Sequence, residues 1–259
     1  MIYITGDVHS KNLLSWEHEG YGSNAKTSIR YLEILKKYGL SSTLFVNGIC
    51  LDDEEKDIRK LLDFDVEFGG HTYDNFGNNK FNIFKSYINR KFFNCVYGPS
   101  FYQKNDIKKT RISFEKFGLK MSSWRTHAFG SSDKTFEILQ ENGVKYVSDL
   151  LGCTKPFCEK GIIHIPINIP VDQSTIAFGP ILNTENRSPF AGCTKGRINP
   201  EEWLGIVLDR VHNNEKNGIP SVLLLHPATM AYIDNFRLFE KLIKSLSNYE
   251  SAKISEFKL

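Results

Sequence analysis

The chain of 259 residues, 41% of them hydrophobic, is long enough to bury a sizeable core, which excludes a disordered protein. Its net charge is only +3 and acids and bases are interspersed, so nothing in the composition indicates binding to nucleic acid or to an anionic membrane surface. The first residues lack the apolar segment of a secretion signal, and no apolar run approaches the roughly 18 residues of a spanning helix. We therefore expect a cytoplasmic protein.

Strands and helices alternate along the chain. The pattern predicts strands at 2–6, 42–46, 65–69, 121–125, 145–148, 162–166 and 221–225, and helices at 25–38, 53–62, 104–117, 133–142, 200–216 and 234–247. Gly39, Gly118, Gly143 and Gly218 each end an amphipathic helical stretch where a C-cap needs a positive φ, and a strand follows. Most of the strands are continuous apolar runs, which is typical of parallel strands covered on both faces. The sequence predicts one α/β domain over 1–259 with no linker.

Two segments interrupt this alternation. The segment 76–103 is rich in Phe, Tyr and Asn, and we expect it to contain a helical piece and to cover one end of the sheet. The segment 168–199 contains three prolines and three glycines, and we expect a loop that could close over a substrate.

Polar residues follow the predicted strands at the point where each strand ends. They are Asp7, His9, Asn47, His71, Arg125, Asp149 and His226. In parallel α/β folds the active site lies at the carboxyl ends of the strands, so these side chains are candidates for one site. Polar residues at strand ends also serve as ordinary helix caps, which is the alternative.

The five cysteines are an odd number, which favours reduced thiols over disulfide bonds. Cys153, Cys158 and Cys193 could form a three-thiolate metal site, but their spacing favours ordinary buried or loop thiols.

The ordered segments "TGDVH", "TLFVNG", "EFGGHTYDN", "WRTHAFG" and "LLLHP" resemble the motifs of the polysaccharide deacetylase family, the NodB-homology or carbohydrate esterase family 4 type. The resemblance extends over about residues 1–230. It implies a distorted (β/α)7 barrel and a metal-dependent hydrolase that removes acyl groups from N-acetylated sugars.

The resemblance also implies catalytic roles. Asp7 matches the family's catalytic base, Arg125 matches the arginine that orients this base, and His226 matches the general acid. Asp7 should therefore stay ionised beside Arg125, and His226 should protonate the leaving amine.

The metal ligands depart from the family's pattern. His71 matches the first histidine of the His-x-x-x-His motif, but Asn75 occupies the second position, and His9 lies where one branch has an acid. An amide oxygen is a poor ligand for a transition metal, so we expect Asp74 or His127 to compensate for Asn75. We expect 71–75 to form one helical turn, which places positions 71, 74 and 75 on one face. His127 also departs from the family, which usually has proline there. The hypothesis is one divalent ion, zinc-like, bound by His71 and His9 with a third ligand; the alternative is a ligand set that has decayed.

Tyr73, Trp124 and Phe129 lie near the predicted rim and are candidates for stacking on a sugar, although core packing is the commoner role of aromatic residues. We therefore expect an N-acyl small molecule or oligosaccharide as substrate, such as an N-acetylated sugar precursor. Two alternatives remain open. One is a hydrolase of another non-peptide C–N bond, and the other is an inactive carbohydrate-binding relative.

Overall fold

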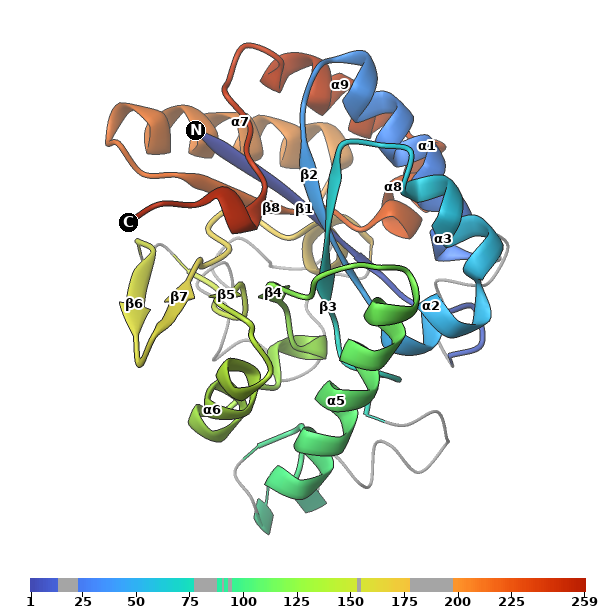
Figure 1. Ribbon diagram of the computed structural model, residues 1–259. Helices are drawn as coiled ribbons and strands as arrows, with labels where there is room; N and C mark the ends of the chain where they lie inside the picture. The colour runs from blue at the N-terminus through green and yellow to red at the C-terminus, as the bar shows by residue number, and fades with distance from the viewer. Residues whose placement is uncertain (14–22, 77–87, 90, 93–94, 153–154, 178–197) are drawn as a thin grey trace.

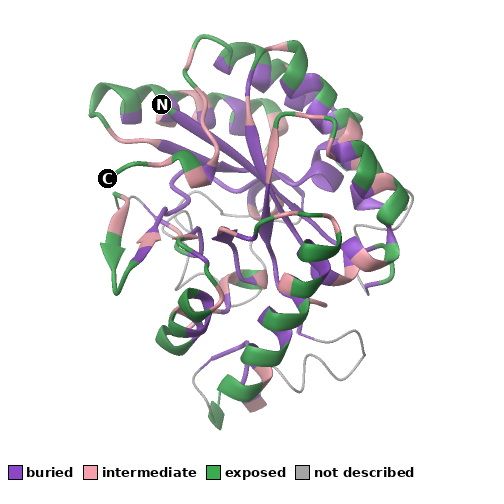
Figure 2. Cartoon of the chain, in the orientation of Figure 1, coloured by how far each residue is buried: buried purple, intermediate pink, exposed green. Residues whose placement is uncertain are grey.

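The computed structural model describes residues 1–13, 23–76, 88–89, 91–92, 95–152, 155–177 and 198–259 (Figure 1). In these ranges the strands form one sheet in the order β6-β7-β5-β4-β3-β2-β1-β8. Helices surround the sheet in Figure 1, and in Figure 2 their buried surfaces face the strands while their outer surfaces are exposed.

All the predicted strands are present and pair in parallel within the described ranges. They are β1 (Ile2–Val8), β2 (Ser42–Val46), β3 (Val66–Gly70), β4 (Ser123–Trp124), β5 (Tyr146–Val147), β7 (Ile162–His164) and β8 (Ser221–Leu224). The sequence did not predict β6 (Phe157–Glu159), a short exposed strand that pairs antiparallel with β7. Its hairpin turns at Lys160 and Gly161, which have φ values of 48° and 78°, as a two-residue turn between twisted strands requires.

The six predicted helices are present, with differences in their bounds and with two additional helices in the described ranges. The described helices are α1 (Asn24–Lys37), α2 (Gly48–Asp53), α3 (Glu55–Leu61), α5 (Ser100–Lys116), α6 (Asp133–Glu141), α7 (Pro200–Lys216), α8 (Pro227–Asp234) and α9 (Arg237–Leu246). The helix predicted at 53–62 corresponds to α3, the one predicted at 104–117 begins earlier, and neither α2 nor α8 was predicted. The four C-cap glycines have the expected positive φ, from 63° to 82°.

Side chains alternate across each strand, and β1 shows how this directs polar groups into the sheet's interior. Ile2 and Ile4 pack in the large core beneath the helices, whereas Tyr3 belongs to a second apolar cluster that includes Phe45 and Ile254. Thr5 and Asp7 continue the face of Tyr3 because successive odd positions share one side of a strand. Asp7 therefore lies inside the curved sheet, near its carboxyl end.

The two ends of the curved sheet meet at Asn168. No strand pair joins β7 to β8 in the described ranges. Instead, the Asn168 Oδ1 accepts the Val222 N–H at 2.9 Å, and its Nδ2 donates to the Pro220 carbonyl at 2.8 Å. The α/β fold with its parallel strands confirms the predicted fold class. The Asn168 backbone N–H also donates to the Val222 carbonyl at 3.3 Å, so the backbone and side chain of this residue connect the edges where a closed barrel would have a strand pair.

Most of the predicted covering segments lies outside the described residues. This is true of 77–87 and 178–197, and also of Cys153 and Cys193, so the expected lid and the three-thiolate alternative are not described. The described part of 168–199 begins with buried residues and contains the π-helix η3 (Gln173–Ala177). None of the helices in the described ranges is both long enough and apolar enough to span a membrane.

Candidate metal centre and catalytic residues

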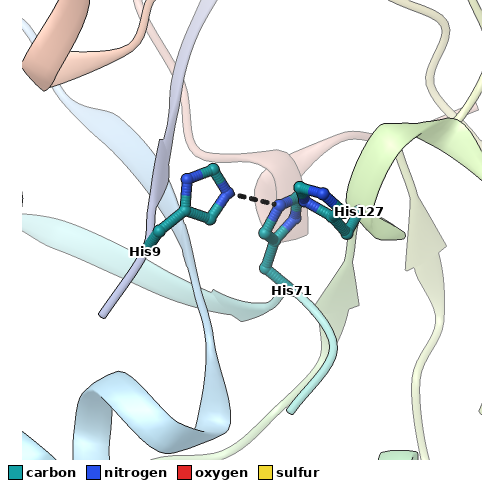
Figure 3. Close-up of side chains that lie close together, drawn as sticks. All are labelled: His9, His71 and His127. Atoms are coloured by element: carbon teal, nitrogen blue, oxygen red, sulfur yellow. Dashed lines mark hydrogen bonds between the residues drawn. The ribbon is translucent and has the colours of Figure 1, made fainter. Parts of the chain in front are cut away.

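Three histidines from different strands meet at the carboxyl end of the sheet (Figure 3). His9 and His71 directly follow β1 and β3, respectively. His127 begins the short 3-10 helix η2 (His127–Phe129) after β4. One ring nitrogen from each lies within 4.8 Å of the other two. Since β4, β3, β2 and β1 follow one another in the sheet, residues far apart in the sequence come to one point.

The donor set fits a divalent metal ion. The Nε2 atoms of His9 and His71 are 3.0 Å apart, close to the roughly 3.3 Å between two imidazole ligands on a tetrahedral ion with bonds of about 2.0–2.1 Å. The Nδ1 of His71 lies 2.8 Å from the Arg125 carbonyl oxygen, so a proton on Nδ1 donates there and leaves the Nε2 lone pair for an ion. Burial lowers the pKa of His71 to about 3, against the opposing charge of Asp7, so the ring is in its neutral, metal-binding form.

Asn75 and Asp74 have other surroundings. Residues 71–75 do not form the helical turn that we assumed, because Thr72 and Asn75 have φ values of 61° and 56°. The Asn75 Oδ1 accepts a hydrogen bond from Asn47 Nδ2 at 2.9 Å. Asp74 does not belong to the three-histidine group and lies near Tyr102. Of the alternatives that the sequence left open, the structure brings His127 to His9 and His71.

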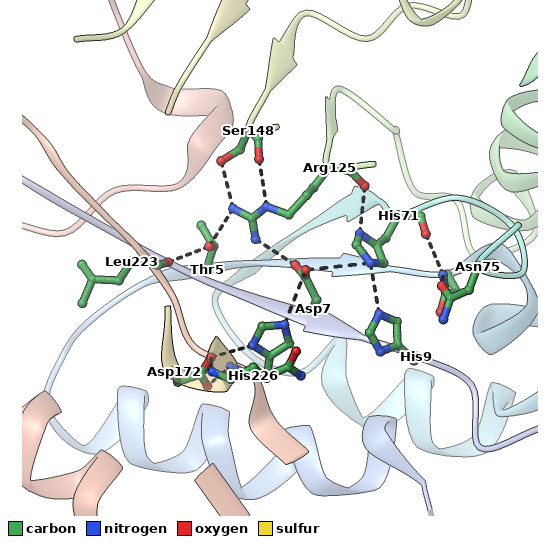
Figure 4. A network of polar contacts seen from close by, with 12 residues as sticks. Thr5, Asp7, His9, His71, Asn75, Arg125, Ser148, Asp172, Leu223 and His226 are labelled. Atoms are coloured by element: carbon green, nitrogen blue, oxygen red, sulfur yellow. Dashed lines mark hydrogen bonds and ion pairs between the residues drawn. The ribbon is translucent and has the colours of Figure 1, made fainter. Parts of the chain in front are cut away.

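Asp7 lies beside His71 and His226, as Figure 4 shows. Its Oδ1 accepts from Arg125 Nη1 at 2.8 Å, which is the expected ion pair, and its Oδ2 lies 3.8 Å from the Nε2 atoms of both His71 and His226. Burial alone would raise the pKa of Asp7, but Arg125 and the surrounding histidines hold it well below its usual range. Asp7 is therefore an ionised carboxylate with one oxygen facing the candidate site.

Arg125 is fully buried and its guanidinium is fixed on several sides. Besides Asp7, it donates to Thr5 Oγ1 at 2.9 Å, to Ser148 Oγ at 2.9 Å and to the Ser148 carbonyl at 3.0 Å. The guanidinium also lies over the Phe45 ring, 4.3 Å from its centroid. These contacts prevent Arg125 from moving away from Asp7.

His226 is held by a carboxylate that the sequence did not indicate. The Asp172 Oδ1 lies 2.7 Å from His226 Nδ1, and its Oδ2 accepts the His226 backbone N–H at 2.7 Å. This pair fixes the ring so that Nε2 faces Asp7. Asp172 follows the apolar stretch "INIPV", so it is a polar residue after an apolar run like the other candidates, but the sequence predicted a loop there. Because the chain is irregular there, the sequence pattern did not indicate Asp172 as a site residue.

The three aromatic candidates are engaged elsewhere. Trp124 is fully buried, so it has no face for a sugar, and this burial contradicts the expectation that it stacks on substrate. The Tyr73 hydroxyl donates to Asp52 at 3.1 Å, and Lys109 lies over the Tyr73 ring. Phe129 is half-buried against the apolar cluster inside the sheet.

Comparisons with known proteins agree with this fold. The family model described as polysaccharide deacetylase matches residues 18–147, half of the chain. Solved structures similar to the chain include a putative polysaccharide deacetylase from Mycobacterium smegmatis, with a TM-score of 0.73 and 15% identity over 98% of this chain and 86% of that one. An allantoinase has a TM-score of 0.65 and 13% identity over 98% and 86% of the two chains.

A further similar structure is a carbohydrate esterase family 4 pseudoenzyme from Bacillus anthracis, with a TM-score of 0.53 and 16% identity over 98% of this chain and 64% of that one. A search among curated proteins gives no match. At such low identities, the structural similarities show the fold alone.

Proposed function

Because the chain belongs to the polysaccharide deacetylase family, we propose that it is a metal-dependent hydrolase that removes the acetyl group from an N-acetylated sugar or sugar precursor. The observation that supports this most is the three-histidine group beside an ionised Asp7 and a buried His226. These groups supply a metal site, a base and a proton donor within one small volume. Metal-assisted hydrolysis of an amide uses all three.

The residues proposed to hold the ion are His9, His71 and His127. Three neutral imidazoles suit zinc and neighbouring transition metals, whereas magnesium and calcium prefer oxygen ligands. A divalent ion bound there would polarise the acyl carbonyl and make a water molecule more acidic. We therefore expect one zinc-like ion per chain.

The protein's own groups divide the proton transfers between them. Asp7 is ionised and accepts the proton of the attacking water, while Arg125 keeps the carboxylate in place and favours its charged form. His226, whose Nε2 lies 3.8 Å from the Asp7 Oδ2, delivers a proton to the leaving nitrogen. Asp172 fixes the ring of His226 and stabilises it when it is protonated.

The structural similarity to a pseudoenzyme raises the possibility of an inactive protein. Measured against the family's pattern, the chain has lost a histidine at Asn75, but it has gained His127 at the metal site. Loss of function would explain the missing metal ligand at position 75. It would not explain a new histidine at the same site. The three-histidine group therefore favours a working metal centre over a decayed one.

The test is release of acetate by protein purified without chelator and supplied with zinc. The substrate panel contains N-acetyl sugars and nucleotide sugars carrying an N-acetyl group. Allantoin, which releases no acetate, is tested with a separate assay for opening of its ring and examines the alternative of another C–N bond. We expect acetate release, and we expect Asp7→Asn to lower the rate by about 100-fold to 10,000-fold while metal binding is retained. Glu67→Gln, at the opposite end of β3, is the matched control and should keep full activity. Zinc-loaded protein that releases acetate from no member of the panel would contradict the proposal.

A further inference from the structure

His127 is the least securely placed of the three proposed metal donors. His9 and His71 lie within one residue of long strands, whereas His127 lies three residues beyond the two-residue strand β4. The turn that follows it contains Ala128 and Phe129 with φ values of 51° and 53°, a conformation that L-residues other than glycine rarely adopt. A turn with such strained φ values is stable only where neighbouring residues hold it in place.

One end of this turn is fixed by a buried carboxylate. Trp124 pairs with Val147 in the parallel ladder of β4 and β5, so the positions two residues further along, Thr126 and Asp149, lie side by side. The Asp149 Oδ1 accepts the Thr126 N–H at 2.6 Å and its Oδ2 accepts the Thr126 hydroxyl at 2.6 Å. The same hydroxyl accepts the Trp124 indole N–H at 3.0 Å. Asp149 thus binds both the backbone and the side chain of the residue directly before His127.

The other end of the turn is also bound by Asp149, through a side-chain hydrogen bond with Ser131. The Cys95 thiol donates to the Gly130 carbonyl at 3.1 Å, a contact weaker than a hydrogen bond to a carboxylate. The His127 ring itself lies edge-on to Phe76, with centroids 5.5 Å apart. Asp149 is therefore the strongest restraint on the position of His127 among these contacts.

We propose that Asp149 is a positioning residue whose two hydrogen bonds to Thr126 keep the imidazole of His127 at the metal site and so determine metal affinity. This inference rests on the proposed function, since it assumes that His127 binds the ion. Asp149 does not touch the ion or the substrate; it acts through Thr126. The alternative is a purely structural role in joining β4 to β5.

The test measures metal affinity in the purified full-length chain. Zinc affinity is determined by competition with a chromophoric chelator, and Co²⁺ is added separately because its visible absorption is stronger in four-coordinate sites than in five- or six-coordinate ones. Asp149→Asn should weaken zinc binding by about 10-fold to 100-fold, the usual effect of losing a group that orients a ligand. The Co²⁺ spectrum of this variant should resemble that of His127→Ala.

Glu67→Gln is the matched control, because Glu67 also accepts one hydroxyl and one backbone N–H, from Thr43 and Ser255, at the other end of the sheet. Its zinc affinity should equal that of the wild type. Thr126→Val removes the hydroxyl at nearly constant volume and should weaken zinc binding, whereas Thr126→Ser keeps the hydroxyl and should restore it. The two Thr126 variants also test the inference if Asp149→Asn does not fold.

Two outcomes separate the inference from the proposed function. If the wild type binds zinc and both Asp149→Asn and Thr126→Val bind it equally well, Asp149 has only a structural role and the inference is wrong. If the wild type binds no metal, the proposed function fails and the inference fails with it.

Discussion

Replacement of Asp106 by asparagine should change how the folding stability depends on pH. Asp106 lies in α5 and is buried, and its Oδ2 accepts the Tyr97 hydroxyl at 2.6 Å and the Tyr73 N–H at 2.9 Å. Burial raises the pKa of Asp106 from 3.8 to about 7, although these two hydrogen bonds oppose the shift. The folded chain therefore keeps a proton on Asp106 at pH values where the unfolded chain has lost it.

The direction of the effect follows from proton linkage. Between pH 4 and pH 7 the folded state binds more protons at Asp106 than the unfolded state, so stability falls as pH rises through this interval. A shift from 3.8 to about 7 corresponds to about 4 kcal/mol in total, of which about 2 to 3 kcal/mol is lost between pH 5 and pH 8. Asparagine cannot titrate, and its amide oxygen can accept the same two hydrogen bonds.

The assay is urea unfolding of the wild type and of Asp106→Asn at pH 5, 6, 7 and 8. The free energy of unfolding of the variant, relative to the wild type, should increase by about 2 to 3 kcal/mol from pH 5 to pH 8. The same substitution at the exposed Asp133 controls for the loss of one charge. A difference between Asp106→Asn and the wild type that stays constant with pH, or that decreases, would refute the reasoning.

Three further substitutions test the packing and the proton donor. Gly70→Ala would place a Cβ 2.4 Å from a ring carbon of the fully buried Trp124, so it should lower the free energy of unfolding by about 1 to 3 kcal/mol in urea. Gly205→Ala in α7 meets nothing within 4 Å and should instead raise it by about 0.5 to 1 kcal/mol, from helix propensity; equal effects at the two glycines would contradict the packing argument. Asp172→Asn removes the negative charge beside His226. It should lower kcat about 10-fold to 100-fold and move the alkaline limb of the activity profile to lower pH. An unchanged pH profile would show that Asp172 has only a structural role.

The sequence predicted the sheet well because its signals are local. A strand such as 42–46 is a continuous apolar run, and Gly39 before it marks the end of a helix, so each element can be identified from a few neighbouring residues. The strand β6 was missed because it is three residues long and largely exposed. The helix α8 was missed because Pro227 after His226 indicated only the end of a strand, whereas proline is also suited to the first turn of a helix.

The site was less predictable because it depends on backbone conformations that residue types do not favour. Thr72 is β-branched and still has a φ of 61°, so no propensity could show that the chain turns away from a helix directly after His71. That turn is why the sequence could not decide among Asp74, Asn75 and His127. Asp172 was missed for a related reason, since its partnership with His226 joins segments 54 residues apart.

The central claim is that His9, His71 and His127 together hold one metal ion. The most direct measurement is the zinc content and zinc affinity of three proteins purified in parallel without chelator: the wild type, His127→Ala and Asn75→Ala. Asn75 is the matched control, because it occupies the family's usual ligand position but accepts a hydrogen bond from Asn47. We expect about one zinc per chain in the wild type, a similar affinity in Asn75→Ala and a loss of affinity by orders of magnitude in His127→Ala. A wild type without zinc, or a loss in Asn75→Ala equal to that in His127→Ala, would contradict the claim.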